Sequence, residues 1–305
     1  MEPGTSPPVV GFIGFGEAGS AIARGLRSAG VDQIFAYDIK SDSSDFGSRI
    51  HERARESQTT LVDSSSDLAE VSTLLFSTVT STSALDAAKE TVASLSARHT
   101  FADLNSVSPA LKQEIQKVID ESGASFVEAA VMAPVQPYGH KVPMLLGGPG
   151  ADAFAATMRP FGMRLDVLTG AKVGSAAAVK MCRSIVVKGL EALLLECVMA
   201  ATKFEADGLV FASLDESFPG IDWKKLADYT SGRVVVHGER RAREMDEVAE
   251  TLRAIGIDPI MAEATARRQD WSAEMDLRSH FGPDGPKTYR EVVDVIAKLS
   301  VVRQT

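Results

Sequence analysis

The stretch from Val9 to Asp38 constrains the fold of this 305-residue chain more than any other part of it. It opens with a short apolar run and a glycine-rich turn, continues with apolar residues at helical spacing, and closes with a second apolar run. This order predicts a β-α-β unit with the pattern G-x-G-x-x-G at its first turn. The residues of that turn are the candidates for contact with a dinucleotide: Gly14, Phe15, Gly16, Glu17, Ala18 and Gly19.

Each glycine of the turn has its own expected role. Gly14 allows the tight bend, Gly16 lets a pyrophosphate approach the backbone, and Gly19 lets the helix pack closely on the sheet. The N–H groups at the helix start, with the positive end of the helix dipole, suit a diphosphate. Asp38 lies 22 residues after Gly16, where a carboxylate would accept hydrogen bonds from the adenosine ribose. The sequence therefore predicts NAD as cofactor, with NADP possible because Lys40 and Ser41 follow the acid closely.

Composition narrows the class of protein. Hydrophobic residues make up 45% of the chain and charged residues 24%, as in ordinary globular proteins of about two domains. The net charge of −9, without a block of like charges, argues against binding to nucleic acid or to an anionic membrane surface. We see no secretory signal and no uninterrupted apolar span, so we expect a cytoplasmic protein.

Cysteine and histidine spacing predicts neither a disulfide nor a metal site. Cys182 and Cys197 fall on one predicted helix, roughly 22 Å apart, which is far beyond disulfide reach. Four histidines show no metal-ligand spacing and are interpreted as surface or loop residues: His51, His99, His140 and His280.

The order of the expected elements predicts the fold class. Up to about residue 172, short apolar runs alternate with helical patterns, which is typical of a doubly wound, mainly parallel sheet. Strands are expected at 9–13, 34–37, 60–62, 73–79, 99–104, 125–131 and 144–146. Helical patterns follow at 175–204, 223–229, 239–255, 259–277 and 287–300. We therefore expect an α/β Rossmann domain over 1–172 and an all-α substrate and oligomerisation domain over 173–305.

Lys180 is the first candidate for chemistry in the second part of the chain. It lies among apolar residues near the start of the long helix, where desolvation would lower its pKa and suit it to proton transfer. Ser184 follows one turn later on the same face. From these residues alone, a lysine that extends its amine into water remains the alternative.

Three further motifs accompany the glycine turn in a fixed order. They are Asp103-Leu104-Asn105-Ser106-Val107-Ser108-Pro109, then Glu128-Ala129-Ala130-Val131-Met132-Ala133-Pro134, then Gly174 with Lys180. Over nearly its whole length the chain resembles the β-hydroxyacid dehydrogenase family, which includes 3-hydroxyisobutyrate dehydrogenase and 6-phosphogluconate dehydrogenase.

The resemblance implies roles for individual residues. Lys180 matches the family's catalytic lysine, and the strand end Thr78-Val79-Thr80 matches the segment beside the cofactor. The implied contacts of a small-molecule substrate are Asn105, Ser106, Met132 and Ser184. The resemblance also implies a homodimer or homotetramer formed through the helical domain.

The chain departs from the family pattern at several positions. Met132-Ala133-Pro134 stands where the family has Ser-Gly-Gly, which helps to hold a substrate carboxylate. Ala176 replaces a glycine before the lysine, and Arg183-Ser184 replaces two asparagines after it. The family's later Lys-Asp pair has no clear counterpart, Arg243-Glu244 being the nearest.

The segment from Ser231 to Met245 resembles a C-terminal domain of unknown function that accompanies one branch of the superfamily. Within it, His237, Arg240 and Arg241 could bind a substrate or a phosphate, since arginine offers a bidentate fork. The alternative is that these residues lie at the start of a helix, with their charged groups in water and no ligand to bind.

These features together predict an NAD(P)-dependent dehydrogenase. A hydride would pass between the nicotinamide and the carbinol carbon of a small hydroxy acid or related alcohol, with Lys180 as general acid and base. Two alternatives stay open: an imine or ketone reductase on the same scaffold, and a non-catalytic dinucleotide-binding regulatory protein. The lysine argues against both.

Overall fold

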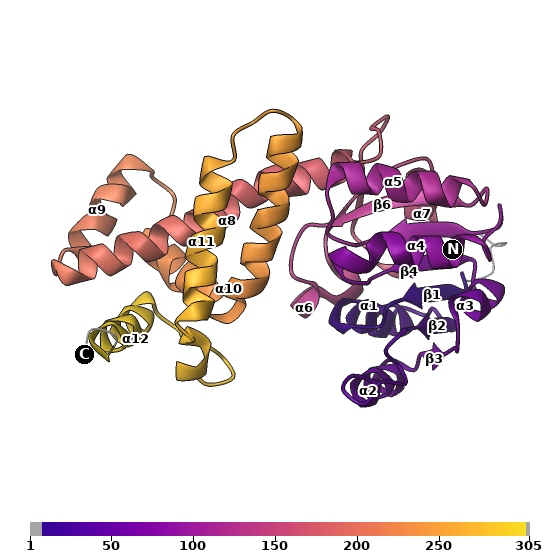
Figure 1. Ribbon diagram of the computed structural model, residues 1–305, viewed down its shortest axis with the longest axis horizontal. Coiled ribbons are helices and arrows are strands. Elements are labelled where there is room, and N and C mark those ends of the chain that lie inside the picture. The colour runs from indigo at the N-terminus through magenta and orange to yellow at the C-terminus, as the bar shows by residue number, and fades with distance from the viewer. Residues whose placement is uncertain (1–7, 303–305) are drawn as a thin grey trace. The chain divides into compact units, whose positions relative to one another are not determined.

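The computed structural model describes residues 8–302, and the chain divides into two compact units, Met1–Lys180 and Met181–Thr305. The first unit contains one eight-stranded sheet with the strand order β3-β2-β1-β4-β5-β6-β7-β8 (Figure 1). All neighbouring strands are parallel except β6 and β7, which are antiparallel. The strands are β1 Val10–Ile13, β2 Ile34–Tyr37, β3 Thr60–Leu61, β4 Leu74–Ser77, β5 Thr100–Asp103, β6 Ser125–Val131, β7 Met144–Gly147 and β8 Leu165–Val167.

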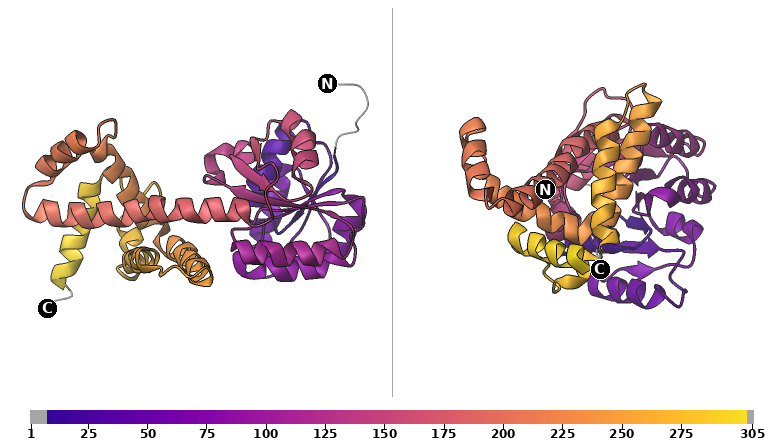
Figure 2. Two further views of the ribbon diagram at one scale, coloured as in Figure 1. Left: turned by 90° about the horizontal axis from the view of Figure 1, so that it is seen from above. Right: turned by 60° about the vertical axis from the view of Figure 1, so that its left-hand side comes forward.

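Helices cover both faces of this sheet (Figure 2, left). Adjacent residues of β4 are therefore buried in different apolar clusters. Phe76 belongs to one cluster and Leu75 to the other. A strand that is buried on both faces is apolar at successive positions, which explains the continuous apolar runs of the sequence. The helices of this unit are α1 Glu17–Ser28, α2 Gly47–Ser57, α3 Ser65–Val71, α4 Ala84–Val92, α5 Pro109–Asp120, α6 Val135–Tyr138 and α7 Ala151–Met158.

The predicted doubly wound α/β fold is confirmed, with one strand missed. Strand β8 was not predicted, because it has only three residues and one of them, Asp166, is exposed. So short a strand carries almost no periodic signal.

The second unit is helical throughout its described part. Helix α8, Ser175–Lys203, runs from the first unit into the second. The helices that follow it are α9 Asp207–Ser217, α10 Trp223–Ala254, α11 Ile260–Glu274 and α12 Tyr289–Val302. Among the described helices, none is both long and apolar enough to cross a membrane.

Helix α10 is continuous where the sequence predicted two separate helices. The residues between the two patterns are rich in valine and glycine, which have low helix propensity. However, Val234 and Val235 are buried in an apolar cluster, and a Cβ on Gly238 would lie 2.7 Å from the carbonyl oxygen of Gln269 in α11. Close packing of α10 on α11 therefore outweighs the local preference.

Two of the four histidines differ from the expectation of surface or loop residues. His99 and His140 are both buried. The Nε2 atom of His99 lies 2.9 Å from the carbonyl oxygen of Ala69, and burial lowers the pKa of His140. The carbonyl of Ala69 satisfies the buried ring of His99 from 30 residues away, and single-sequence spacing does not reveal such a partner.

Candidate active site

The turn between β1 and α1 has the shape of an anion cradle. Gly14 adopts a φ of +80°, which favours glycine. A Cβ on Gly16 would meet nothing within 4 Å, so the helix start is open in front of this residue. No side chain caps α1, whereas Ser64 and Ser108 cap α3 and α5. Among the described residues, no side chain therefore caps the first N–H groups of α1, and the open space beside them fits a diphosphate.

The residues that directly follow β4 contact this turn. Thr78 Oγ1 donates a hydrogen bond of 2.6 Å to the carbonyl oxygen of Gly14. A Cβ on Gly19 would lie 2.7 Å from Thr78 Oγ1, and a Cβ on Gly14 would lie 2.7 Å from Val79. Thr78 and Val79 thus contact the turn itself, while Thr80 is exposed and lies within hydrogen-bonding distance of Thr82 and Ser83.

Asp38 joins the end of β2 to the glycine turn. Its Oδ2 accepts a hydrogen bond from the N–H of Phe15, and its Oδ1 accepts one from the N–H of Lys40. A carboxylate has about four lone-pair positions, so two remain for a ribose hydroxyl. The side chain of Phe15 is fully buried, and this residue could therefore contact a cofactor only through its backbone. Glu17 is exposed and lies 3.9 Å from Arg53.

A buried ion pair holds the loop after β5. The ammonium of Lys112 lies 2.9 Å from Asp103 Oδ2 and donates to the carbonyl oxygen of Asp103 at 2.8 Å. Asp103 Oδ1 accepts from the N–H of Asn105, whose side-chain amide donates to Ser77 Oγ. Asn105 is therefore anchored rather than extended into solvent. Its Oδ1 is buried and has no hydrogen-bond partner in the described part of the chain, which an absent ligand would explain.

The predicted catalytic lysine meets this loop. The ammonium of Lys180 donates a hydrogen bond to Ser106 Oγ, although 74 residues separate the two in sequence. Lys180 lies in the second turn of α8, and Ser106 follows β5. The structure thus brings together two residues that belong to different sequence motifs.

Met132 directly follows β6 and is half-buried. Its N–H donates to the carbonyl oxygen of Pro143 at 2.9 Å, and Pro134 has no N–H. In Met132-Ala133-Pro134 only the N–H of Ala133 is left for a carboxylate. This segment is therefore a poor counterpart of the Ser-Gly-Gly cradle.

The other predicted substrate contacts belong to a charged cluster within the second unit, which we call the α8–α10 cluster. Ser184 Oγ accepts a hydrogen bond from Lys188, whose ammonium pairs with Glu244 at 2.9 Å. Glu244 also pairs with Arg240. One turn further along α8, the buried Glu191 pairs with Arg241.

Burial and the neighbouring charges shift the pKa values of two groups in the α8–α10 cluster. Burial lowers the pKa of Lys188, and Glu244 partly opposes that change. Burial, with the guanidinium groups of Arg233, Arg240 and Arg241, lowers the pKa of His237 to about 4. At neutral pH the imidazole of His237 is therefore uncharged.

This cluster differs from the sequence expectation in two respects. His237 and Arg240 lie inside α10, so the alternative of a helix start is wrong. Arg243 forms ion pairs with Asp246 and Asp270. Lys188 was not singled out, although its spacing of four residues from Ser184 and eight from Lys180 places all three on one helix face.

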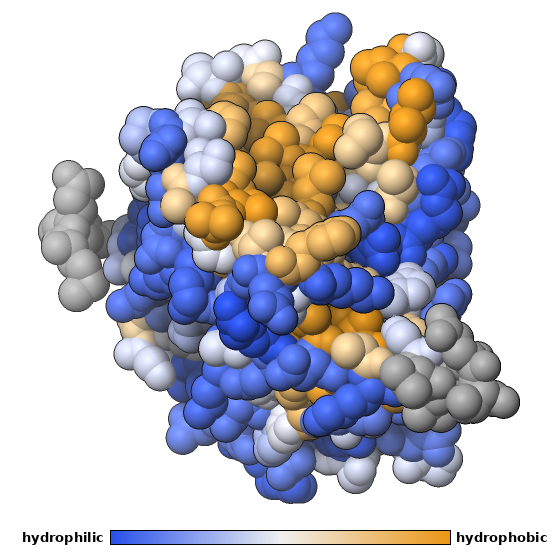
Figure 3. Space-filling view, turned by 90° about the vertical axis from the view of Figure 1, so that its left-hand side faces the viewer, coloured by the Kyte–Doolittle hydropathy of each residue, from blue (hydrophilic) through white to orange (hydrophobic). Residues whose placement is uncertain are grey.

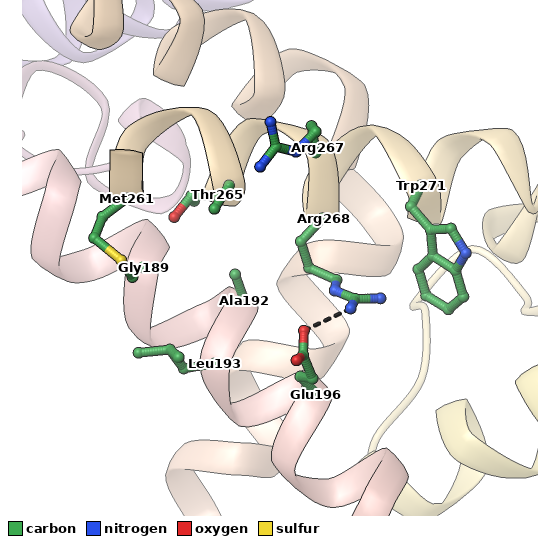
Figure 4. A pocket seen from close by; sticks show the side chains of 10 residues that line it. Gly189, Ala192, Leu193, Glu196, Met261, Thr265, Arg267, Arg268 and Trp271 are labelled. Atoms are coloured by element: carbon green, nitrogen blue, oxygen red, sulfur yellow. Dashed lines mark hydrogen bonds and ion pairs between the residues drawn. The ribbon is translucent and has the colours of Figure 1, made fainter. Parts of the chain in front are cut away.

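A groove of the second unit lies elsewhere, between α8 and α11 (Figure 4). Its volume is about 370 Å³, and its lining includes Gly189, Ala192, Leu193, Met261 and Trp271. The only ion pair drawn across it joins Arg268 to Glu196. None of the predicted site residues lines this groove. Apolar side chains also gather on the face of the molecule shown in Figure 3.

Two family models match the chain. Residues 9–157 match the NAD binding domain of 6-phosphogluconate dehydrogenase, and residues 201–272 match a domain of unknown function (DUF1932). The glycine turn, the Asp103 loop and Glu128 all fall inside the first match, while His237 and Arg240 fall inside the second.

Solved structures and curated proteins include similar chains. A conserved hypothetical protein from Sinorhizobium meliloti 1021 is 34% identical, covers 97% of each chain, and superposes with a TM-score of 0.77. A conserved protein of unknown function, described as structurally similar to 3-hydroxyacid dehydrogenases, is 31% identical over 88% of this chain and 98% of its own, with a TM-score of 0.69. Human mitochondrial 3-hydroxyisobutyrate dehydrogenase is 26% identical over 182 residues, which are 58% of this chain and 52% of the human protein.

Proposed function

The chain belongs to the β-hydroxyacid dehydrogenase family, and from that membership we propose that it oxidises or reduces a small hydroxy acid or related alcohol with NAD(P). The hydride passes between the nicotinamide and the carbinol carbon of the substrate. The observation that carries this proposal is the hydrogen bond from Lys180 to Ser106, because it pairs an amine with a hydroxyl beside the family's substrate motif.

Lys180 acts as the general acid and base. During oxidation its neutral amine takes the proton of the substrate hydroxyl, and during reduction its ammonium returns that proton. Ser106 Oγ accepts from Lys180 and orients the amine. A positioned acid–base group of this kind contributes about 10²- to 10⁴-fold to a rate.

The backbone of the turn from Gly14 to Gly19 would hold the cofactor's pyrophosphate. The nicotinamide, when bound, supplies the hydride donor or acceptor. Asp38 would accept from the adenosine ribose, and its charge would repel a 2′-phosphate. We therefore propose a preference for NAD over NADP.

Ser184, His237 and Arg240 remain proposed substrate contacts. Among Lys188, Arg233, Arg240, Arg241, Glu191 and Glu244, the four cations exceed the two carboxylates. An excess of positive charge favours an anionic group such as a carboxylate.

The helical unit would also join two copies of the chain. Val186, Leu193, Phe204 and Leu209 are large apolar side chains that are mostly exposed. Leu193 and Met261 protrude beside a groove floored by Gly189 and Ala192, so one surface offers both a projection and a hollow. A two-fold contact between identical copies requires this self-complementarity. We therefore assign the surface to a second copy of this chain.

A coupled assay of nicotinamide absorbance tests the proposed reaction. NAD⁺ and NADP⁺ are offered with a panel of hydroxy acids, polyols and aryl alcohols to the parent, to Lys180→Ala and to Lys172→Ala. Lys172 is an exposed lysine just before α8, so it controls for the loss of a charge. We expect turnover by the parent and by Lys172→Ala, and a loss of about 10²-fold or more in Lys180→Ala.

Two results would contradict the proposal. Turnover that survives in Lys180→Ala removes this lysine as the acid–base group and favours an imine or ketone reductase. Tight NADH binding by fluorescence, without turnover of any substrate by the parent, favours a binding protein.

A further inference from the structure

A buried carboxylate lies in the middle of a central strand. Glu128 occupies the fourth position of β6, its exposed fraction is 0%, and apolar residues flank it on both sides: Phe126, Val127, Ala129 and Ala130. Removing a carboxylate from water is costly unless hydrogen bonds hold it. A charge at such a position therefore needs a specific partner.

The partners of Glu128 are backbone N–H groups at the start of α8. Its Oε2 accepts from Gly174 at 2.8 Å and its Oε1 accepts from Ala177 at 2.7 Å. These residues follow Glu128 by 46 and 49 positions in sequence. The carboxylate thus caps a helix that belongs to a distant part of the chain, with its charge at the positive end of the helix dipole.

The surrounding backbone leaves room for this contact. Gly147 is paired with Glu128 on β7, and a Cβ there would lie 2.9 Å from Glu128 Oε2. Gly174 has a φ of +99°, and a Cβ on it would lie 3.0 Å from the carbonyl oxygen of Pro109. Both glycines are therefore needed where the carboxylate meets the helix.

Lys180 follows Ala177 by three residues, which is about one helical turn. Because Glu128 binds two N–H groups on either side of Ser175, it restricts both the rotation and the axial position of the first turn of α8. The next turn carries Lys180, whose ammonium reaches Ser106.

We infer that Glu128 is the positioning residue of Lys180: its carboxylate fixes the start of α8 so that the amine meets Ser106. This inference rests on the proposed function only where it concerns turnover. The placement and ionisation of Lys180 can be measured without any substrate.

Three variants separate charge, geometry and ordinary helix capping. Glu128→Gln keeps the size of the side chain but removes its charge and turns one acceptor into a donor. Glu128→Asp keeps the charge on a shorter side chain. Ser64→Ala removes the cap of α3, whose side chain accepts from the N–H of Asp67, and is the matched control for the loss of a cap remote from Lys180.

The first readout is competitive acylation of lysines, followed by peptide mass spectrometry across a range of pH. Only a neutral amine reacts, so the pH of half-maximal labelling reports the ionisation of Lys180. In Glu128→Gln we expect this midpoint to move to lower pH, because the ammonium loses its hydrogen bond to Ser106 when α8 is displaced. In Glu128→Asp we expect a smaller shift in the same direction, and in Ser64→Ala we expect none.

The second readout is steady-state turnover with the substrate found in the screen. We expect kcat of Glu128→Gln to fall about tenfold to a hundredfold, as for a displaced catalytic group, with the Kd for NADH unchanged. Glu128→Asp should recover part of the rate, and Ser64→Ala should lower only the thermal midpoint.

The inference is overturned if folded Glu128→Gln labels at Lys180 like the parent, or if Ser64→Ala reproduces its loss of rate. If Glu128→Gln does not fold, Glu128→Asp decides: a midpoint below that of the parent supports the inference, and a parental midpoint overturns it. If the parent turns over no substrate, the proposed function fails but the acylation result still decides the role of Glu128.

Discussion

The N–H of Phe15 donates a hydrogen bond of 2.7 Å to Oδ2 of Asp38, which joins the glycine turn to the end of the next strand. The acid thus has a structural contact in addition to the proposed contact with a ribose. Its second oxygen accepts from Lys40. A change at Asp38 therefore affects both the shape of the turn and the choice of cofactor.

Replacing Asp38 with asparagine should shift the cofactor preference. The neutral side chain no longer repels a 2′-phosphate, so we expect the ratio of NADH to NADPH affinity to fall about tenfold, which corresponds to about 1.4 kcal/mol. Fluorescence titration with both cofactors measures the ratio. Asp42→Asn, an exposed acid in the following loop, should leave it unchanged. An unaltered ratio in Asp38→Asn would remove this residue from cofactor selection.

Two alanine substitutions in the glycine turn should affect different properties, one the affinity for NADH and the other the stability. Gly16→Ala places a methyl group in open space at φ −76°, so the free energy of unfolding should change by less than about 1 kcal/mol while NADH affinity falls. Gly19→Ala places a Cβ 2.7 Å from Thr78 Oγ1 and should destabilise the protein by about 1–3 kcal/mol. Denaturant unfolding and NADH titration test the pair. Unchanged NADH binding by Gly16→Ala would argue against the proposed pyrophosphate site.

The buried pair of Lys112 and Asp103 should be critical for stability. Both side chains are at most 1% exposed, so Lys112→Met leaves an unpaired buried carboxylate and should cost about 3–5 kcal/mol in the free energy of unfolding. The matched surface pair is Arg24 with Glu56, each about half exposed, and Arg24→Ala should cost about 1 kcal/mol or less. Similar losses from the two variants, measured by urea unfolding, would contradict this account.

The lowered pKa of His237 should make the protein less stable in mild acid. Between the ordinary histidine value of 6.5 and about 4, the unfolded state binds a proton that the folded state excludes. Stability from this residue is therefore present above pH 6.5 and is lost progressively as the pH falls toward 4. We expect His237→Gln to flatten that part of the stability curve, as followed by urea unfolding. His51→Gln, at an exposed position, should leave the slope unaltered.

The proposed contact between two copies predicts a change in mass on mutation. Leu193→Asp places a charge on the apolar surface of the second unit and should convert a dimer into a monomer, as measured by light scattering after size-exclusion chromatography. Val71→Asp, at an exposed position of the first unit, is the control and should remain dimeric. A parent chain that is already monomeric would refute the assignment of this surface.

Much of the fold follows from local patterns in the sequence. The apolar runs before Gly14 and Asp38 identify β1 and β2, because a strand of a two-sided parallel sheet is apolar along its length. The pattern of the long helix places Lys180 and Ser184 on one face, because residues four apart in a helix are neighbours. For the same reason Lys188 could have been recognised from its spacing.

The tertiary structure alone decided which of these elements meet. Nothing in the spacing around Glu128 indicates that its carboxylate caps α8, and nothing near Ser106 indicates that Lys180 reaches it. Likewise, the local sequence of α10 predicts a break that packing against Gln269 removes. A local pattern shows which face of an element is apolar. Contacts between side chains that are 46 to 74 residues apart depend on how those faces pack, and only the folded chain determines that packing.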